Sequence, residues 1–100
     1  MDQETVHIVA HLLAREGEES RVRAELEKLI EPTRAEPGCL RYELLVNKER
    51  PGDFVFVQEY VSDAAFQAHL DSKHVAGAIA HAVPLLELAP DIRRYRRLEP

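Results

Sequence analysis

Hydrophobic residues recur at every second position in several parts of the chain, a period that is typical of β-strands. This pattern predicts strands over residues 5–13, 39–47, 54–61 and 92–98. The first of these strands is largely apolar on both faces, so we expect other protein to cover both of its sides. One of its faces carries Val6, Ile8, Ala10 and Leu12, and the other carries His7, Val9, His11 and Leu13.

The segment between the first two strands has the 3.6-residue period of an amphipathic helix. We predict a helix over residues 20–34. Pro32 should distort its last turn or end it, because proline lacks the N–H group and clashes with the preceding turn. The apolar stripe of this helix consists of Val22, Leu26, Leu29 and Ile30.

Two serines mark the starts of later helices, because a serine hydroxyl is a preferred N-cap. Ser62 predicts a helix over residues 63–71, and Ser72 predicts one from residue 73 to about residue 86 that Pro84 weakens. The order of elements is therefore strand, helix, strand, strand, helices, strand. This is the split βαβ pattern of a ferredoxin-like α+β domain, with helices on one face of an antiparallel sheet. A chain of 100 residues is enough for one such domain and too short for two.

The second face of this sheet is also apolar in part, since the middle strands place Leu45, Val55 and Val57 on it. An exposed apolar face of that size would be a liability. We therefore expect a symmetric homodimer in which two sheets pack face to face.

The charges argue against a nucleic-acid partner. The formal net charge is −5, and the only basic cluster is Arg93, Arg94, Arg96 and Arg97 around Tyr95. In an acidic background such a run is typical of a strand whose outward side chains form salt bridges.

The N-terminus begins with acidic residues and has no basic region, so it does not resemble a secretory signal. No apolar run approaches the roughly twenty residues that a membrane span requires. Cys39 is the only cysteine, which excludes an intrachain disulfide and fits a reducing compartment. We expect a cytoplasmic protein in which Cys39 is a small buried residue and not a nucleophile.

Three stretches of the chain resemble the antibiotic biosynthesis monooxygenase family of small dimeric α+β barrel proteins. They are EPGCLRYELL from Glu36 to Leu45, PGDFVFVQEY from Pro51 to Tyr60, and DAAFQAHLDSKH from Asp63 to His74. The terminal IRRYRRLEP is similar to the last strand of the family, so the resemblance covers nearly the whole chain. It implies a dimeric α/β barrel. Members of the family include cofactor-free quinol monooxygenases, an isomerase of a phosphorylated signalling sugar, haem-degrading relatives and domains without known activity.

Two positions depart from the pattern of that family. Many members have tryptophan where this chain has Tyr60, and glutamate where it has Gln58. The glutamine removes a candidate base from the cavity side of the third strand. The absence of any tryptophan argues against haem degradation, because those relatives press a tryptophan against the distorted porphyrin.

The third strand should form one wall of a cavity between the sheet and the helices. Its alternation directs Phe54, Phe56, Gln58 and Tyr60 toward the helices, and Val55, Val57 and Glu59 toward a partner subunit. Tyr42 should share the helix side with Leu40 and Leu44, while Glu59 should pair with an arginine. We expect Phe54, Phe56 and Phe66 to hold an aromatic ring, and Tyr42, Gln58 and Tyr60 to orient its oxygens.

Histidines beside the break between the two later helices are candidate bases, because neutral imidazole accepts a proton near pH 7. We expect His69, His74 and Tyr60 to act in catalysis, and His11 and His81 to contact the substrate. His7 and His11 lie about 13 Å apart along a strand, at roughly 3.3 Å per residue, and so cannot chelate one metal ion. No group of residues has metal-ligand spacing, so no metal site is expected. No other cofactor is expected either, because in the reaction described next the substrate itself carries the reducing electrons.

These residues predict a cofactor-independent monooxygenase that oxidises a small phenol or hydroquinone with O₂ to a quinone. A histidine would take the phenolic proton, and the anion would pass an electron to O₂. The radicals would recombine at a ring carbon, and loss of water would give the quinone. Two alternatives stay open: a proton-transfer isomerase in the same pocket, and a non-catalytic small-ligand-binding or stress-associated domain.

Overall fold

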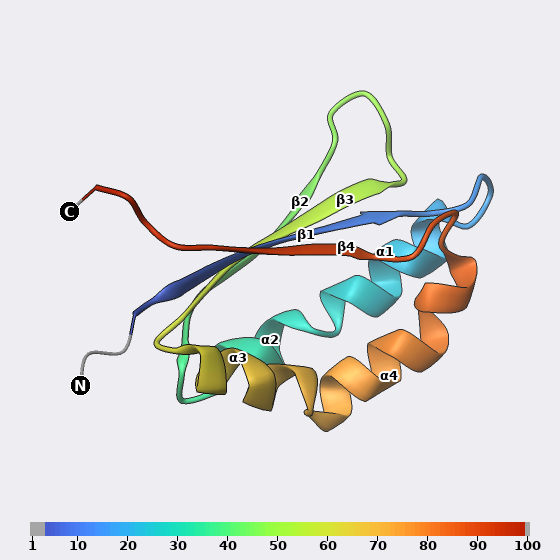
Figure 1. Ribbon diagram of the computed structural model, residues 1–100. Helices are drawn as coiled ribbons and strands as arrows, with labels where there is room; N and C mark the ends of the chain where they lie inside the picture. Colours follow the sequence, from blue (N-terminus) through green and yellow to red (C-terminus); the bar gives the residue numbers. More distant parts are fainter. Residues whose placement is uncertain (1–3, 100) are drawn as a thin grey trace.

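The computed structural model describes residues 4–99 and contains a single antiparallel sheet that a layer of helices covers on one face (Figure 1). The strand order is β2-β3-β1-β4, in which every neighbouring pair is antiparallel. This order confirms the predicted ferredoxin-like α+β domain. The strands are β1 (Val6–Leu13), β2 (Cys39–Val46), β3 (Asp53–Tyr60) and β4 (Asp91–Tyr95).

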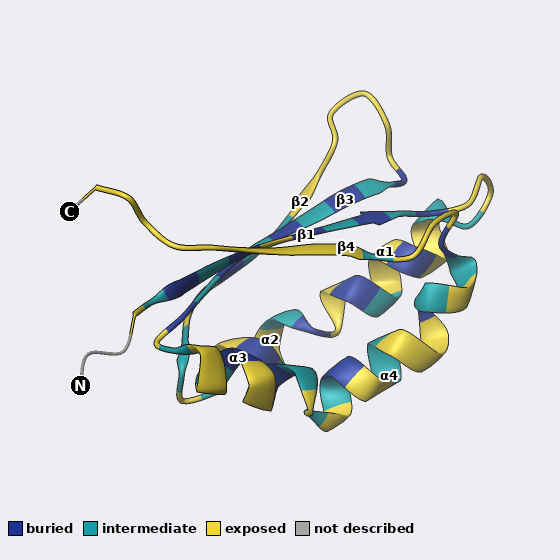
Figure 2. Ribbon diagram, in the orientation of Figure 1, coloured by how far each residue is buried: buried dark blue, intermediate teal, exposed yellow. Residues whose placement is uncertain are grey.

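The helices all lie on one face of the sheet (Figure 1). Their buried sides turn toward the strands, and their exposed sides turn to solvent (Figure 2). None of the helices formed by residues 4–99 has the length and apolarity to cross a bilayer. The helical elements are α1 (Glu19–Glu27), α2 (Ile30–Arg34), α3 (Asp63–Leu70), α4 (Lys73–His81) and the short 3₁₀ helix η1 (Val83–Leu85).

The predicted helix over residues 20–34 is in fact two helices, separated at Lys28 and Leu29. The cause is Pro32, which has no N–H group to donate to the carbonyl of Lys28, one turn earlier. The Leu29 amide instead donates to the Leu26 carbonyl at 3.1 Å, which tightens the chain at the break. Pro84 acts similarly at the other end of the domain, because α4 stops at His81 and the proline lies in η1.

Both predicted serine caps are confirmed. The Ser62 hydroxyl accepts a hydrogen bond from the Ala65 amide at 3.1 Å and starts α3. The Ser72 hydroxyl accepts one from the Val75 amide at 3.3 Å and starts α4. The caps fix where the two helices begin, and therefore the position of a histidine on each.

A β-bulge lies near the start of β2, between Cys39 and Arg41. The bulge restores Tyr42 and Leu44 to the helix side, opposite Gln58 and Phe56 of β3. Leu40, which we expected on the same side, is 56% exposed. Strict alternation fails there because a bulge places two residues opposite one and shifts the facing of the first.

The loop before β2 packs tightly against α3. A Cβ atom added at Gly38 would lie 2.4 Å from the Cβ of Ala65, closer than two carbons can approach. Only glycine fits at that position while Ala65 stays in place. This contact brings the loop that carries Glu36 next to the helix that carries His69.

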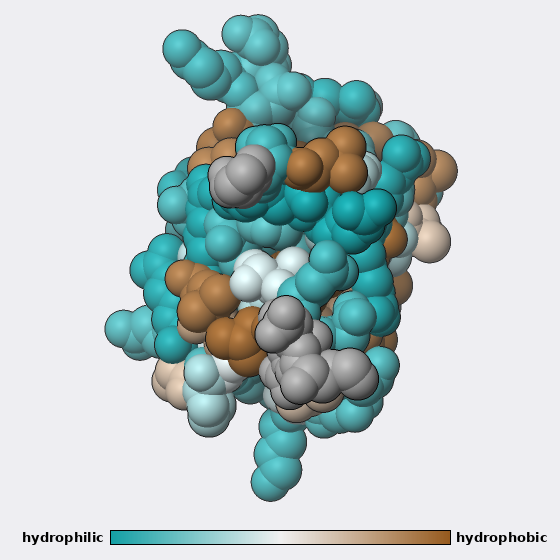
Figure 3. Space-filling model, turned by 60° about the vertical axis from the view of Figure 1, so that its left-hand side comes forward, coloured by the Kyte–Doolittle hydropathy of each residue, from teal (hydrophilic) through white to brown (hydrophobic). Residues whose placement is uncertain are grey.

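The core lies between the sheet and the helices. The predicted helix side of β3 is confirmed, since Phe54, Phe56, Gln58 and Tyr60 are all buried. Of the two faces expected for β1, the one that carries Val6, Ile8, Ala10 and Leu12 is the buried one. Residues of β4 are exposed along their whole length (Figure 2). The end of the molecule that carries the two chain termini is mainly hydrophilic, with separate hydrophobic patches (Figure 3).

Candidate active site

A cavity of about 120 Å³ lies between the helix face of the sheet and the helices. Its walls are almost wholly apolar, with Tyr42, Gln58 and His69 as the polar groups among them. Such a combination of apolar walls and few polar groups is typical of small-molecule sites. The aromatic and aliphatic walls include Phe56, Phe66, Leu70, Val75, Ile79 and Ile92.

His69 is held in place by a carboxylate that the sequence did not reveal. The side chain of His69 is 5% exposed, and its Nδ1 lies 2.9 Å from Oε2 of Glu36. The same Oε2 atom lies 2.5 Å from Nε2 of His74. One carboxylate oxygen from the loop before β2 therefore joins a histidine of α3 to a histidine of α4.

These contacts determine which nitrogen of His69 is available for chemistry. A carboxylate accepts hydrogen bonds, so Nδ1 of His69 and Nε2 of His74 carry the protons. The unprotonated Nε2 of His69 has no hydrogen-bond partner among residues 4–99. This atom is not completely buried. His69 lines the cavity, and Nε2 is the ring nitrogen that Glu36 leaves without a hydrogen bond.

Burial lowers the pKa of His69 below its ordinary value, and the nearby His74 acts in the same direction. The hydrogen bond and the charge of Glu36 oppose this change without reversing it. A histidine with a lowered pKa is neutral at pH 7, which is the state that accepts a proton.

Aromatic rings surround this imidazole. The ring centroids of Tyr60 and Phe66 lie 5.3 and 5.9 Å from that of His69. Tyr42 stacks on Phe56 with 4.7 Å between centroids and an interplanar angle of 25°. Burial, with added repulsion from Glu36, raises the pKa of both tyrosines, so they stay protonated at neutral pH.

Tyr60 lies behind the cavity wall and not on it. Its hydroxyl donates to Oε1 of Gln58 at 2.6 Å, and it is Gln58 that lines the cavity. The predicted role of Tyr60 in orienting a substrate would therefore act through Gln58.

The structure separates four other predicted residues from the cavity. His11 lies on the opposite face of the sheet, where its Nε2 contacts Asp53 at 2.5 Å. Phe54 is buried in the core beyond the cavity, and the His81 side chain is 69% exposed at the end of α4. His74 is not a lining residue and reaches the site through Glu36.

Glu36 was missed because its motif was interpreted only as a turn. Glu36 is 33 residues from His69 and 38 from His74, so no local spacing connects them. The one available signal was that an acidic residue precedes Pro37-Gly38 in a stretch that carries the family resemblance.

Glu36, His69 and His74 also have the atom types of a metal site, and their potential ligand atoms all lie within 4.8 Å of one another. Ligands of one tetrahedral zinc ion, at bond lengths of about 2.1 Å, are roughly 3.4 Å apart. The 2.5 and 2.9 Å contacts are shorter and fit hydrogen bonds. A metal ion would require the three side chains to separate, and the expectation of no metal stays a prediction.

Cys39 and Glu59 have the surroundings that the sequence predicted for non-catalytic residues. Cys39 is partly buried, and burial raises the pKa of its thiol, which disfavours the nucleophilic thiolate. Glu59 lies 3.5 Å from Nη1 of Arg41 on the outer face of the sheet.

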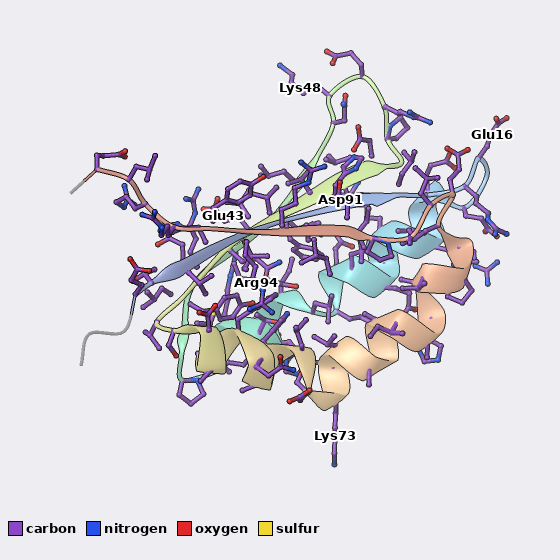
Figure 4. The ribbon with its side chains drawn as sticks, viewed as in Figure 1. Glu16, Glu43, Lys48, Lys73, Asp91 and Arg94 are labelled. Atoms are coloured by element: carbon purple, nitrogen blue, oxygen red, sulfur yellow. The ribbon has the colours of Figure 1, made fainter. Side chains whose placement is uncertain are left out.

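The basic residues near the C-terminus are largely paired, as expected. Arg93 contacts Asp91 at 3.0 Å, and Arg94 contacts Asp63 at 3.4 Å. Arg94 lies on the helix side of β4, opposite Ile8 of β1, and its guanidinium is 5.0 Å from the centre of the Phe66 ring (Figure 4). Arg94 thus covers the outer edge of the aromatic cluster.

The matching family model is described as antibiotic biosynthesis monooxygenase, and it covers residues 5–81. The chain belongs to this family. "Putative monooxygenase Rv0793" of Mycobacterium tuberculosis is 35% identical over 81 residues, which are 81% of this chain and 79% of that protein.

Solved structures of relatives have the same fold. Rv0793 superimposes with a TM-score of 0.90 at 30% identity, over 96% of this chain and 97% of the other. SO0527 of Shewanella oneidensis superimposes with a TM-score of 0.88 at 32% identity, over 96% and 93% of the two chains.

Proposed function

We propose that the protein is a cofactor-independent monooxygenase that oxidises a small phenol or hydroquinone with O₂ to a quinone. The observation that carries this proposal is the position of His69. Its Nδ1 is held by Glu36, while its Nε2 is free beside an apolar, aromatic cavity. Membership of a family described as monooxygenases supports the same type of reaction.

The volume of the cavity favours a substrate with a single ring. An apolar cavity of roughly 150 Å³ holds benzene, and this cavity measures about 120 Å³. A phenol fits with modest movement of the wall side chains, whereas a fused polycyclic compound does not. The paired rings of Tyr42 and Phe56 offer a surface on which one aromatic ring can stack.

The reaction begins when Nε2 of His69 takes the phenolic proton. The phenolate gives one electron to O₂, and the resulting radical and superoxide combine at a ring carbon. The O–O bond of the peroxide then breaks as the same carbon loses its proton, which yields the quinone and one molecule of water. A phenol and one O₂ thus give one quinone and one water, and the substrate supplies every electron.

The experiment that tests this proposal compares turnover with and without oxygen. A panel of single-ring phenols and hydroquinones is incubated with metal-free protein, and O₂ uptake and quinone absorbance are recorded. We expect quinone formation only in air, with one O₂ consumed per quinone. Substrate conversion under anaerobic conditions would instead identify the proton-transfer isomerase, and no conversion with any phenol would leave a binding domain.

We also propose that two copies of the chain pair through the outer face of the sheet. On that face Val9, Leu45 and Tyr95 are exposed although they are large and apolar or aromatic. No helix among residues 4–99 covers this face (Figure 1). A second copy would bury these side chains by sheet-on-sheet packing.

The chain has a mass of 11.4 kDa, and sedimentation velocity at micromolar concentration should show a species of about twice that mass. Leu45→Arg should shift it toward the monomer, because the substitution places charge in the apolar interface. Glu49→Arg on the exposed hairpin loop is the matched control and should leave the dimer intact. A wild-type protein that sediments only as a monomer would contradict the pairing.

A further inference from the structure

Tyr60 and Gln58 form a buried hydrogen-bonded pair behind and within the cavity wall. Both point to the helix side of β3, with 0% and 4% of their surface exposed. The Tyr60 hydroxyl donates to Oε1 of Gln58 at 2.6 Å, a short distance for a neutral pair. No other side chain among residues 4–99 bonds to this amide.

The pair fixes which end of the amide meets the cavity. A carboxamide has one oxygen and one NH₂ group, and Tyr60 occupies the oxygen. Nε2 of Gln58 has no hydrogen-bond partner in the described part of the chain. It is nevertheless not completely buried. Because Gln58 lines the cavity, its NH₂ group is the end that has access there.

The fixed donor stands near the proposed base. Gln58 is directly opposite Tyr42 in the β2–β3 ladder, and the Tyr42 ring lies 5.7 Å from the His69 ring between centroids. The cavity therefore presents one acceptor, Nε2 of His69, and one oriented donor, Nε2 of Gln58. Apart from Tyr42, the remaining lining residues are apolar.

We propose that Gln58 is a specificity-determining residue, held by Tyr60, that selects single-ring phenols bearing a second oxygen able to accept a hydrogen bond. The inference rests on the proposed function and narrows its substrate class. The phenolic O–H would face His69, and the second oxygen, as a hydroxyl, ether or carbonyl, would face the Gln58 NH₂ group. A ring with a methylene in place of that oxygen would leave the donor buried and unpaired, which costs binding free energy.

Matched phenols test this selectivity by binding alone. Methoxyphenols and ethylphenols have the same size and differ by an oxygen in place of a methylene, so each positional isomer forms a pair. We expect calorimetry or NMR titration without O₂ to show that at least one methoxyphenol binds roughly tenfold more tightly than its ethylphenol partner. Equal affinities within each of the three pairs, or no binding of any of these phenols, would overturn the inference.

Three variants locate the effect. Gln58→Leu should bring the ratio of affinities to about one, and Tyr60→Phe should reduce it to roughly threefold, because the released amide can turn either end to the cavity. Gln67→Leu removes an exposed glutamine of α3 and should keep the wild-type ratio. A Gln58→Leu protein that retains the tenfold ratio would overturn the assignment even if Tyr60→Phe failed to fold.

The ratio of affinities tests the selectivity, and O₂ uptake tests the proposed reaction, so either proposal can be contradicted without the other. A protein that prefers methoxyphenols but consumes no O₂ keeps the selectivity and loses the proposed reaction. A protein that consumes O₂ with phenols, but binds the members of each pair equally, keeps the reaction and loses the selectivity.

Discussion

Replacing His69 by alanine is expected to lower kcat/KM for quinone formation by roughly 10²–10⁴-fold, the range that a positioned general base contributes. His69 supplies the unprotonated nitrogen beside the cavity, and no second histidine lines it. The measurement is initial O₂ uptake with a monocyclic phenol at saturating oxygen. Circular dichroism and thermal unfolding establish that the variant is folded.

Alanine variants of the other histidines should lose less activity than His69→Ala. His81→Ala should retain wild-type kcat/KM, because that exposed side chain lies outside the cavity. His74→Ala should reduce activity less than His69→Ala, since His74 acts only through Glu36. A His69→Ala protein that is as active as the His81→Ala protein would remove the proposed base.

The pH profile provides a second check on His69. Its pKa is lowered chiefly by burial, so the neutral, proton-accepting form persists below the ordinary histidine value. The kcat/KM should therefore rise with pH and level off after a midpoint below about 6.5. A rising limb centred near 8 would point to another base.

Replacing Glu36 by alanine is expected to lower both stability and activity. The variant leaves Nδ1 of the buried His69 without a partner, which should cost roughly 1–3 kcal/mol of unfolding free energy. For a domain of this size each 1 kcal/mol corresponds to a fall in Tm of roughly 4–8 °C. Loss of the fixed tautomer should also reduce kcat/KM by roughly 10–1000-fold, less than the roughly 10⁴-fold loss when the carboxylate behind the histidine of a Ser-His-Asp triad is replaced.

Glu36→Gln distinguishes positioning from simple stabilisation. The glutamine oxygen can still accept both hydrogen bonds. The negative charge of the carboxylate, which stabilises protonated His69, is lost. Because Glu36 raises the pKa of His69, the midpoint of the kcat/KM profile should move to lower pH in this variant. Glu31→Gln, at an exposed position of α2, is the control and should have the wild-type midpoint. An unchanged midpoint in Glu36→Gln would mean that the carboxylate acts only on the fold.

Local patterns in the sequence predicted much of the fold. The alternation of β3 separated its aromatic inner face from Val55, Val57 and Glu59, and the serines at 62 and 72 marked the starts of α3 and α4. These features depend on neighbouring residues, for which period and capping chemistry are sufficient. The break at Lys28–Leu29 and the bulge before Tyr42 were missed in detail, because each depends on hydrogen bonds that extend beyond a periodic pattern.

The site was predictable only in part, for a different reason. The sequence identified His69, Gln58, Tyr42, Phe56 and Phe66, because all belong to elements with clear facing, and all line the cavity. It wrongly placed three other residues at the cavity. His11 lies on the outer face of the sheet, because strand alternation alone does not tell which face the helices cover. Phe54 and His81 lie beyond the cavity, because facing alone does not tell how far along an element a cavity extends. Glu36 was invisible because it reaches His69 from a loop, across 33 residues of sequence.

The near-contact of Gly38 with Ala65 connects side-chain size to the proton on the imidazole. The loop can carry its carboxylate to within 2.9 Å of His69 only because residue 38 has no side chain and residue 65 has one methyl group. Positions 38 and 65 therefore have a shared volume limit, in which growth at one must be matched by loss at the other. Exceeding that limit would push the loop outward, lengthen the Glu36–His69 hydrogen bond and release the imidazole to exchange tautomers. The chemistry available in the cavity thus depends partly on two of the smallest residues in the protein, although neither of them lines the cavity.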